Sequence, residues 1–304
     1  MDLPALVKRL AWVCAGVTVL AGLYLAFQLP RQRSLFAGKM DRVVRIHLQL
    51  DSSQLDLTKQ EKEWSVGLST GPRFPADPDK VTRLKNGLGG IQIEERISSR
   101  ADRAGDFDVT VTSGLCVRLY GKNNKLLAEG LFGKQAPDFT HIYFRYPGRP
   151  AVYLARGIIR GELGEPELGS WRRRQLISFP EAKIQAIQIK GPGYQTSLAQ
   201  SSGVWTVDGK PANPAPVYGL VGVLSHLQAD GFADFVSVTF DQLTDASIHI
   251  EGNGQSADLR IGSLDPKTKR YLVSAGPTAG LAWLTEDKIK SLLLKSSAFQ
   301  PKKP

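Results

Sequence analysis

The side chains of this sequence that could do chemistry begin with two pairs of acidic residues. Asp106 and Asp108 are separated by one residue. On a strand, alternate positions share one face, and two such carboxylates could form a glycosidase pair or a cation site. A turn beside Gly105 explains the same residues without catalysis, and we favour the turn. Glu94-Glu95 belongs to no further motif, and the sequence therefore predicts no catalytic residue.

The chain contains four histidines and two cysteines, which is a small set for metal binding. The histidines are His47, His141, His226 and His249, and no two have the i, i+4 spacing with which a helix chelates a metal. Cys14 lies in an apolar N-terminal segment and Cys116 in an expected strand, so we expect no disulfide between them. Gly252-x-Gly254 lacks the third glycine of a dinucleotide-binding turn. The sequence predicts neither a metal nor a cofactor.

Three consecutive arginines, Arg172, Arg173 and Arg174, follow Trp171. In one interpretation they form a solvated loop in which Trp171 packs and the arginines pair with acidic residues within 165–167. In the other, these four residues form a partner surface for anionic lipid headgroups or an acidic protein patch. The remaining positive charge, within a formal net charge of +10, is spread along the chain without interleaved aromatic residues. We therefore expect no nucleic-acid partner.

The elements that must position these residues occur in two copies. Pro75-Ala76-Asp77-Pro78 and Pro211-Ala212-Asn213-Pro214 each lead into apolar residues at helical spacing, and a Trp-x-Val precedes each, at Trp64 and Trp205. The apolar stripes are Val81, Leu84, Leu88 and Ile91, and Val217, Leu220, Leu224 and Leu227, offset by 136 positions (217 − 81 = 136). Such self-similarity indicates two copies of one module. The paired tryptophans are better explained as core anchors than as carbohydrate platforms.

Short strands surround both predicted helices, so we expect an α+β fold in which each module is an antiparallel sheet with a short amphipathic helix. The expected strands of the first copy lie at 43–50, around Trp64, and at 109–119, 126–132, 142–146 and 151–154. Those of the second lie at 184–189, around Trp205, and at 248–250, 257–261, 271–273 and 282–284, before a closing helix over 286–294. The expected organisation is an N-terminal membrane anchor (1–30), a linker (31–41), repeat module 1 (42–160), a basic junction (161–180), repeat module 2 (181–297) and a loose tail (298–304).

The N-terminal anchor is inferred from residues 10–29, a run of 20 residues without charge. At about 1.5 Å per residue, it is long enough to span a hydrocarbon core of roughly 30 Å. A cleaved signal peptide is the alternative, but the run is long for one and no cleavage pattern closes it. Basic residues flank both ends, so charge alone does not fix the orientation. We expect a single-pass protein of the inner (cytoplasmic) membrane, with its body on the periplasmic or extracytoplasmic side.

The paired Trp-x-Val and Pro-Ala-x-Pro signatures, with the basic junction Trp171–Phe179, resemble the domain-of-unknown-function family numbered 4340. The resemblance covers roughly residues 43–290 and is clearest over 60–240. It implies a bacterial envelope protein with one N-terminal transmembrane helix, often encoded near ABC-type transport or gliding-motility components. It supplies no catalytic residues, and Arg173 stands where the family often has an acidic residue.

These observations predict a non-enzymatic envelope protein. The leading hypothesis is a scaffold or accessory subunit of a transport-like membrane complex, with the bilayer contacted through residues 10–29. Its protein partners would be an ABC-type transporter or other envelope membrane proteins. The alternative is a ligand-binding module for an envelope glycan or lipid, with a site between the two repeats, because clefts between domains commonly bind ligands.

Overall fold

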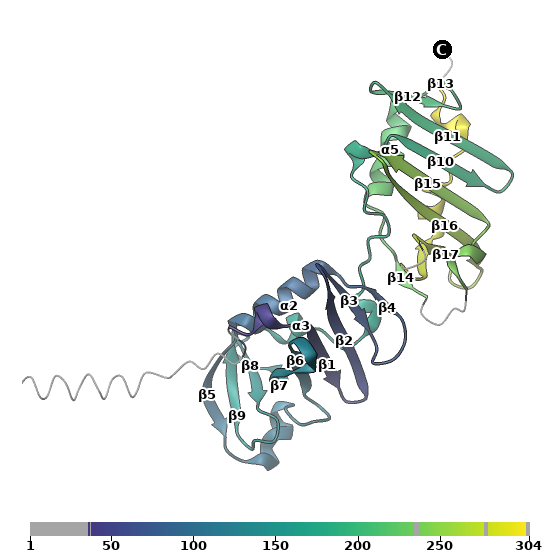
Figure 1. Ribbon diagram of the computed structural model, residues 1–304. Coiled ribbons are helices and arrows are strands. Elements are labelled where there is room, and N and C mark those ends of the chain that lie inside the picture. The colour runs from purple at the N-terminus through teal and green to yellow at the C-terminus, as the bar shows by residue number, and fades with distance from the viewer. Residues whose placement is uncertain (1–35, 37, 234–237, 277–278, 302–304) are drawn as a thin grey trace, which may run out of the picture. The chain divides into compact units, whose positions relative to one another are not determined.

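The computed structural model describes residue 36 and residues 38–233, 238–276 and 279–301. Within them the chain forms two nine-stranded antiparallel sheets and few helices (Figure 1). This confirms the α+β class and the antiparallel sheets. The predicted anchor over residues 1–30 lies outside the described residues.

The first sheet has the strand order β4-β3-β2-β1-β6-β7-β8-β9-β5. Helix α2 follows β4, and the chain then adds β5 at the opposite edge of the sheet before returning beside β1. The elements are β1 (Arg45–Leu50), β2 (Ser53–Gln60), β3 (Glu63–Gly67), β4 (Arg73–Pro75), α2 (Pro78–Gly90), β5 (Gln92–Ser98), β6 (Leu115–Tyr120), β7 (Leu126–Gln135), β8 (His141–Arg145) and β9 (Val152–Arg156).

The second sheet repeats this topology strand for strand, in the order β13-β12-β11-β10-β15-β16-β17-β18-β14. Short helices α3 (Arg160–Leu163) and α4 (Leu168–Trp171) join the two copies. The elements are β10 (Ala186–Gly191), β11 (Tyr194–Ser201), β12 (Val204–Val207), β13 (Lys210–Pro211), α5 (Pro214–Ser225), β14 (Gly231–Phe232), β15 (Ala246–Gly252), β16 (Gln255–Asp265), β17 (Arg270–Ser274), β18 (Ala282–Thr285) and α6 (Glu286–Leu292).

The repeat extends to local irregularities of the sheets. The register between β7 and β8 shifts between Phe132 and Gln135, and the register between β16 and β17 shifts between Ile261 and Leu264. Both shifts follow an apolar residue and a glycine, Phe132-Gly133 in the first copy and Ile261-Gly262 in the second. A bulge kept at the same place in both copies is a feature of the module itself.

The two repeated helices form because both copies combine a cap with an apolar stripe. Asp77 Oδ1 accepts hydrogen bonds from the backbone N–H groups of Asp79 and Lys80 at 3.0 Å, and Asn213 Oδ1 accepts one from Ala215 at 3.3 Å. These caps satisfy donors that a helix N-terminus otherwise leaves free. The eight apolar residues of the two stripes are all buried. The predicted helices are therefore confirmed.

The strand predictions were less complete. Strands β2, β4, β5, β11, β13 and β14 were not predicted, and the strand expected over 109–119 is only β6, from Leu115. Residues 101–107 instead form a 3-10 helix, which ends at Asp108 with a φ of 53°. Asp106 and Asp108 therefore do not alternate on a strand: Asp106 lies in the 3-10 helix, and Asp108 lies in the left-handed turn that ends it.

The chain divides into two compact units. The first consists of the described residues up to Gln54 together with Thr82–Pro166, and the second of Leu55–Val81 together with the described residues from Glu167 onward. In the first unit, the rings of Phe36, Phe132 and Phe144 pack with centroid distances of 6.1 and 5.3 Å. In the second, α5 and α6 contribute to an apolar core that includes Trp205. Trp205 is buried, whereas Trp64 is half-buried.

Candidate functional site

The basic junction places Arg172 inside the second unit. Its side chain is 2% exposed, and its guanidinium carbon lies 3.7 Å from the ring centroids of both Phe74 and Phe232. Its Nη2 donates to the carbonyl of Ala279 at 3.2 Å. A guanidinium held between two aromatic rings combines cation–π attraction with flat stacking. Arg172 therefore locks β4, the junction and β14 together, and its side chain is not available to a partner.

Backbone hydrogen bonds fix the residues on either side of Arg172. The N–H of Asp77 donates to Trp171 O at 2.8 Å, the N–H of Arg173 to Pro75 O at 2.9 Å, and the N–H of Ala229 to Arg174 O at 2.8 Å. Trp171 is buried, as its packing interpretation predicted. A surface role is consequently left to the side chains of Arg173 and Arg174.

Arg173 and Arg174 differ in their surroundings. Arg173 Nη2 lies 3.3 Å from Glu63 Oε1, in a partly exposed ion pair. Arg174 is exposed, and its guanidinium makes no hydrogen bond or ion pair with any described residue. Such an unpaired arginine, presented from a fixed backbone, can bind an anionic group bidentately.

A pocket of about 650 Å³ lies beside Arg174, and all its lining residues belong to the second unit. Its volume is in the range of small-molecule sites. The apolar walls come from the β3–β4 loop, α4 and β14, and the polar groups are a carboxylate, a guanidinium and two hydroxyls. The lining residues include Leu68, Phe74, Leu168, Phe232, Glu167 and Arg174.

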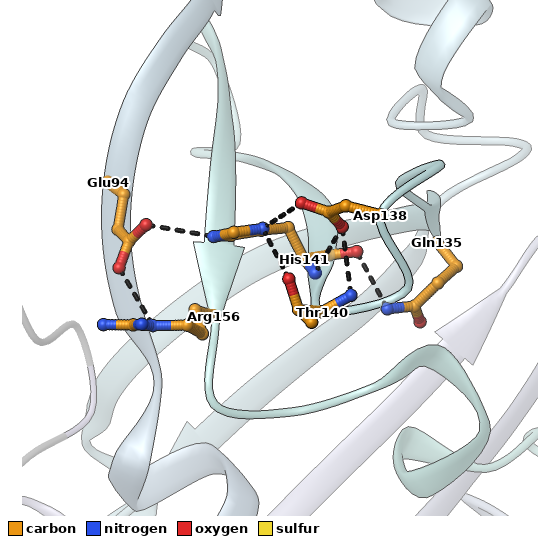
Figure 2. Close-up of polar contacts among 6 residues, drawn as sticks. All are labelled: Glu94, Gln135, Asp138, Thr140, His141 and Arg156. Carbon is orange, nitrogen blue, oxygen red and sulfur yellow. Dashed lines mark hydrogen bonds and ion pairs between the residues drawn. The ribbon is translucent and has the colours of Figure 1, made fainter.

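Figure 2 shows a second polar cluster, built around His141 in the first unit. Asp138 Oδ1 accepts the backbone N–H groups of Thr140 and His141 at 3.0 Å, which fixes the turn before β8. His141 Nδ1 lies 2.5 Å from Asp138 Oδ2, and Nε2 lies 3.0 Å from Glu94 Oε2 on β5. The other oxygen of Glu94 lies 3.1 Å from Arg156 Nε on β9. One histidine thus connects the turn to the edge strand.

The geometry of this cluster favours a structural role. Both ring nitrogens of His141 already face carboxylates, so neither is free to accept a proton from a substrate. Burial opposes the charged form of His141, but the hydrogen bonds to Asp138 and Glu94 outweigh it and raise its pKa. The hydrogen bond from His141 lowers the pKa of Asp138 to about 2. Protonated His141 and the carboxylates of Asp138 and Glu94 therefore form a charged clamp between the turn and β5.

The stability of the first unit is expected to depend on pH through His141. Because its pKa is higher in the folded state, the clamp's contribution is fully present below about pH 6.5 and is lost as pH rises through the raised pKa. Replacing His141 with glutamine should flatten this dependence and cost about 1 kcal/mol at pH 6. Urea unfolding of both proteins at pH 6 and pH 8 measures this, and an unchanged pH dependence in the variant would contradict it.

The second copy carries a related cross-strand pair. His249 on β15 lies opposite Asp258 on β16, with Nδ1 2.7 Å from Oδ1, and Nε2 lies 2.8 Å from Glu251. The hydrogen bond to Asp258 raises the pKa of His249, although burial opposes it. In the first copy, Arg118 on β6 lies opposite Glu129 on β7 at the matching place. The two copies thus keep a cation–carboxylate pair, and only the second can titrate near neutral pH.

Sequence reasoning missed one catalytic pattern, Gly67-Leu68-Ser69-Thr70-Gly71, which matches the Gly-x-Ser-x-Gly form of a nucleophile elbow. Its context differs from that of a nucleophile elbow, because it joins β3 to β4 and no helix follows Ser69 directly. Ser69 is exposed, and no described histidine or carboxylate contacts it. A serine without a base is a weak nucleophile.

The acidic pairs do not assemble into a site either. Asp106 Oδ2 pairs with Arg103 Nε at 2.8 Å, and Glu94 belongs to the His141 clamp. Among the described residues, no three histidine, cysteine, aspartate or glutamate side chains form a group that could hold a metal ion. Cys116 is a buried free thiol, and burial raises its pKa to about 11.

The fold and site define a class of protein: a tandem α+β repeat with an arginine-locked junction and an adjoining pocket. The chain belongs to the DUF4340 family, a domain of unknown function, whose model matches residues 64–247. The resemblance drawn from the paired motifs is thereby confirmed. No curated protein and no solved structure matches the chain.

The predicted membrane contact falls on residues 10–29, outside the described residues. Among those that are described, no helix has the length and apolar character needed to cross a bilayer.

Proposed function

We propose that this protein is a non-enzymatic, membrane-anchored scaffold or accessory subunit of a transport-like membrane complex. The anchor and the transport association come from residues 10–29 and from the family resemblance. The observation that carries the binding role is a difference between the two matched helices, α2 and α5.

The outer face of α2 is charged, whereas that of α5 is not. Asp79, Lys80 and Arg83 of α2 correspond to Ala215, Pro216 and Gly219, and α5 has no charged residue over its whole length. Tyr218 is 56% exposed and Val223 is 38% exposed on this helix. A helix that is apolar all round is normally covered. The α5 outer face therefore supports contact with an apolar surface of a partner subunit.

Replacing Gly219 with arginine gives α5 the residue that α2 has at the matching position. A Cβ at Gly219 meets nothing within 4 Å, and removing glycine from a helix interior stabilises it by up to about 1 kcal/mol. We expect an equal or higher free energy of unfolding, and at least about a tenfold loss of partner recovery if the face is central to the contact. Affinity purification of the full chain in mild detergent, at native expression, measures recovery.

The matched control is Arg83→Gly in α2, which should cost up to about 1 kcal/mol of stability and leave recovery unchanged. Equal recovery of the same membrane proteins with both variants would remove the α5 outer face from the proposal. Absence of any membrane partner from the wild-type purification would contradict the accessory role itself.

The second candidate function is ligand binding, and the pocket beside Arg174 favours it. This function requires no partner subunit, and it is compatible with the first.

A further inference from the structure

We propose that the pocket beside Arg174 binds a zwitterionic amphiphile with one aliphatic chain, the chemistry of a single-chain phospholipid. The inference goes beyond the accessory role and does not depend on it. It rests on the shape and residue types of the pocket, on its two unpaired charges and on the rigidity of its walls.

The walls of the pocket suit an aliphatic body. Leu68, Leu168 and Phe232 reach it from three separate segments, the β3–β4 loop, α4 and β14. The side chain of Leu68 is 47% exposed. Covering these side chains would stabilise a complex by about 25 cal/mol for each Å² of apolar surface buried.

The same walls are poorly suited to a sugar. Burying the hydroxyl groups of a sugar costs free energy unless each finds a hydrogen-bond partner, and a sugar ring can stack only on an aromatic face that is not covered. Here one face each of Phe74 and Phe232 is already covered by the guanidinium of Arg172. Of the two hydroxyls in the lining, that of Ser170 already donates to Glu167 O at 2.8 Å. Too few polar groups remain in the lining to form hydrogen bonds with the hydroxyl groups of a sugar ring.

The charges of the lining determine the head group. Arg174 and Glu167 both line the pocket, and within the described chain their side chains form no ion pair with each other or with any other residue. Arg174 can bind a phosphate bidentately, and Glu167 can bind an ammonium. A head that carries both groups satisfies both side chains, whereas a purely anionic head leaves Glu167 opposed to it.

The pocket is also held in shape before binding. Arg172 fixes the rings of Phe74 and Phe232, the Arg174 carbonyl accepts the N–H of Ala229, and the Ser170 carbonyl accepts from Lys80 Nζ at 2.5 Å. A preformed site loses less conformational entropy on binding. Arg172 thus helps to hold the walls of this pocket in place.

The test uses dodecylphosphocholine below its micelle concentration, titrated by calorimetry into the full chain held in an amphipathic polymer, with the polymer alone as blank. We expect one site per chain and at least about tenfold weaker binding of phosphocholine, which lacks the tail. Arg174→Gln and Leu68→Asn should each weaken dodecylphosphocholine by about tenfold, because one removes the phosphate contact and the other an apolar wall. Arg173→Gln, one residue away but paired with Glu63, is the matched control and should bind like the wild type.

Glu167→Gln decides the head group. It should weaken dodecylphosphocholine and strengthen dodecyl phosphate, which has the same tail and only the anionic group. If it strengthens both or changes neither, the zwitterionic assignment is wrong. Equal affinities of Arg174→Gln and Arg173→Gln, or no binding by folded wild-type protein, would overturn the site. Because no partner is present, this failure is distinct from failure of the accessory role.

Discussion

Replacing Arg172 with alanine is expected to lower the free energy of unfolding by about 2–5 kcal/mol, the range for truncating a large buried side chain to alanine. The change removes a guanidinium stacked on both Phe74 and Phe232 and a hydrogen bond to Ala279 O. It also leaves a void between the two rings, whose walls lose their contacts. Urea unfolding followed by tryptophan fluorescence measures the effect, since Trp171 is buried next to it.

Two variants identify the cause of this loss. Arg172→Lys keeps the charge but not the flat stacking surface, so an intermediate loss is expected. Arg173→Ala removes the neighbouring arginine from a partly exposed pair with Glu63 and should cost about 1 kcal/mol or less. If Arg172→Ala costs no more than Arg173→Ala, the guanidinium does not lock the junction.

Replacing Gly252 with alanine is expected to cost about 3 kcal/mol or more, at the upper end of overpacking. A Cβ at this position would lie 1.7 Å from the carbonyl oxygen of Lys183 and 2.8 Å from its carbonyl carbon. Both atoms are backbone, and the neighbouring N–H of Gln185 donates to Glu251 O at 2.9 Å. Relief therefore requires the segment that leads into β10 to separate from the end of β15. Urea unfolding of the variant, compared with the wild type, measures this cost.

The matched control lies in the same hairpin. Gly254 has a φ of +72° and open space at its Cβ position, so Gly254→Ala meets only backbone strain and should cost about 1 kcal/mol. If Gly252→Ala costs as little stability as Gly254→Ala, the backbone before β10 can move at little cost, and the prediction is contradicted.

The helices and the doubling could be predicted from sequence because their causes are local. Asp77 and Asn213 cap the turn that follows them, and each apolar stripe repeats every three or four residues. Strands such as β2 and β5 were missed because they are stabilised by pairing with other strands of the sheet and not by a local pattern. In β5 only Ile93 is buried, and the sequence Gln92–Ser98 has no regular alternation, because an edge strand with register shifts has little need of one.

The candidate site could be located from sequence but not interpreted. Three consecutive arginines identify the junction, yet nothing in their types distinguishes the buried Arg172 from the exposed Arg174. The pocket was not predicted, and the Gly67–Gly71 pattern that contributes to it was overlooked. The sequence also gave no sign of the contact between His141 and Glu94. The two residues are 47 positions apart, and only the pairing of strands brings them together.

The sequence by itself therefore determined the repeated module, its helices and caps, and its membership of the DUF4340 family, since these follow from short-range spacing and from motifs. The tertiary structure alone decided what the arginines do. Arg172 is enclosed because Phe74 and Phe232, and the carbonyl of Ala279, which is 107 positions away along the chain, converge on it. Burial and charge pairing depend on which distant segments meet, and this is the physical reason why residue types and spacing could not separate a structural arginine from a binding one.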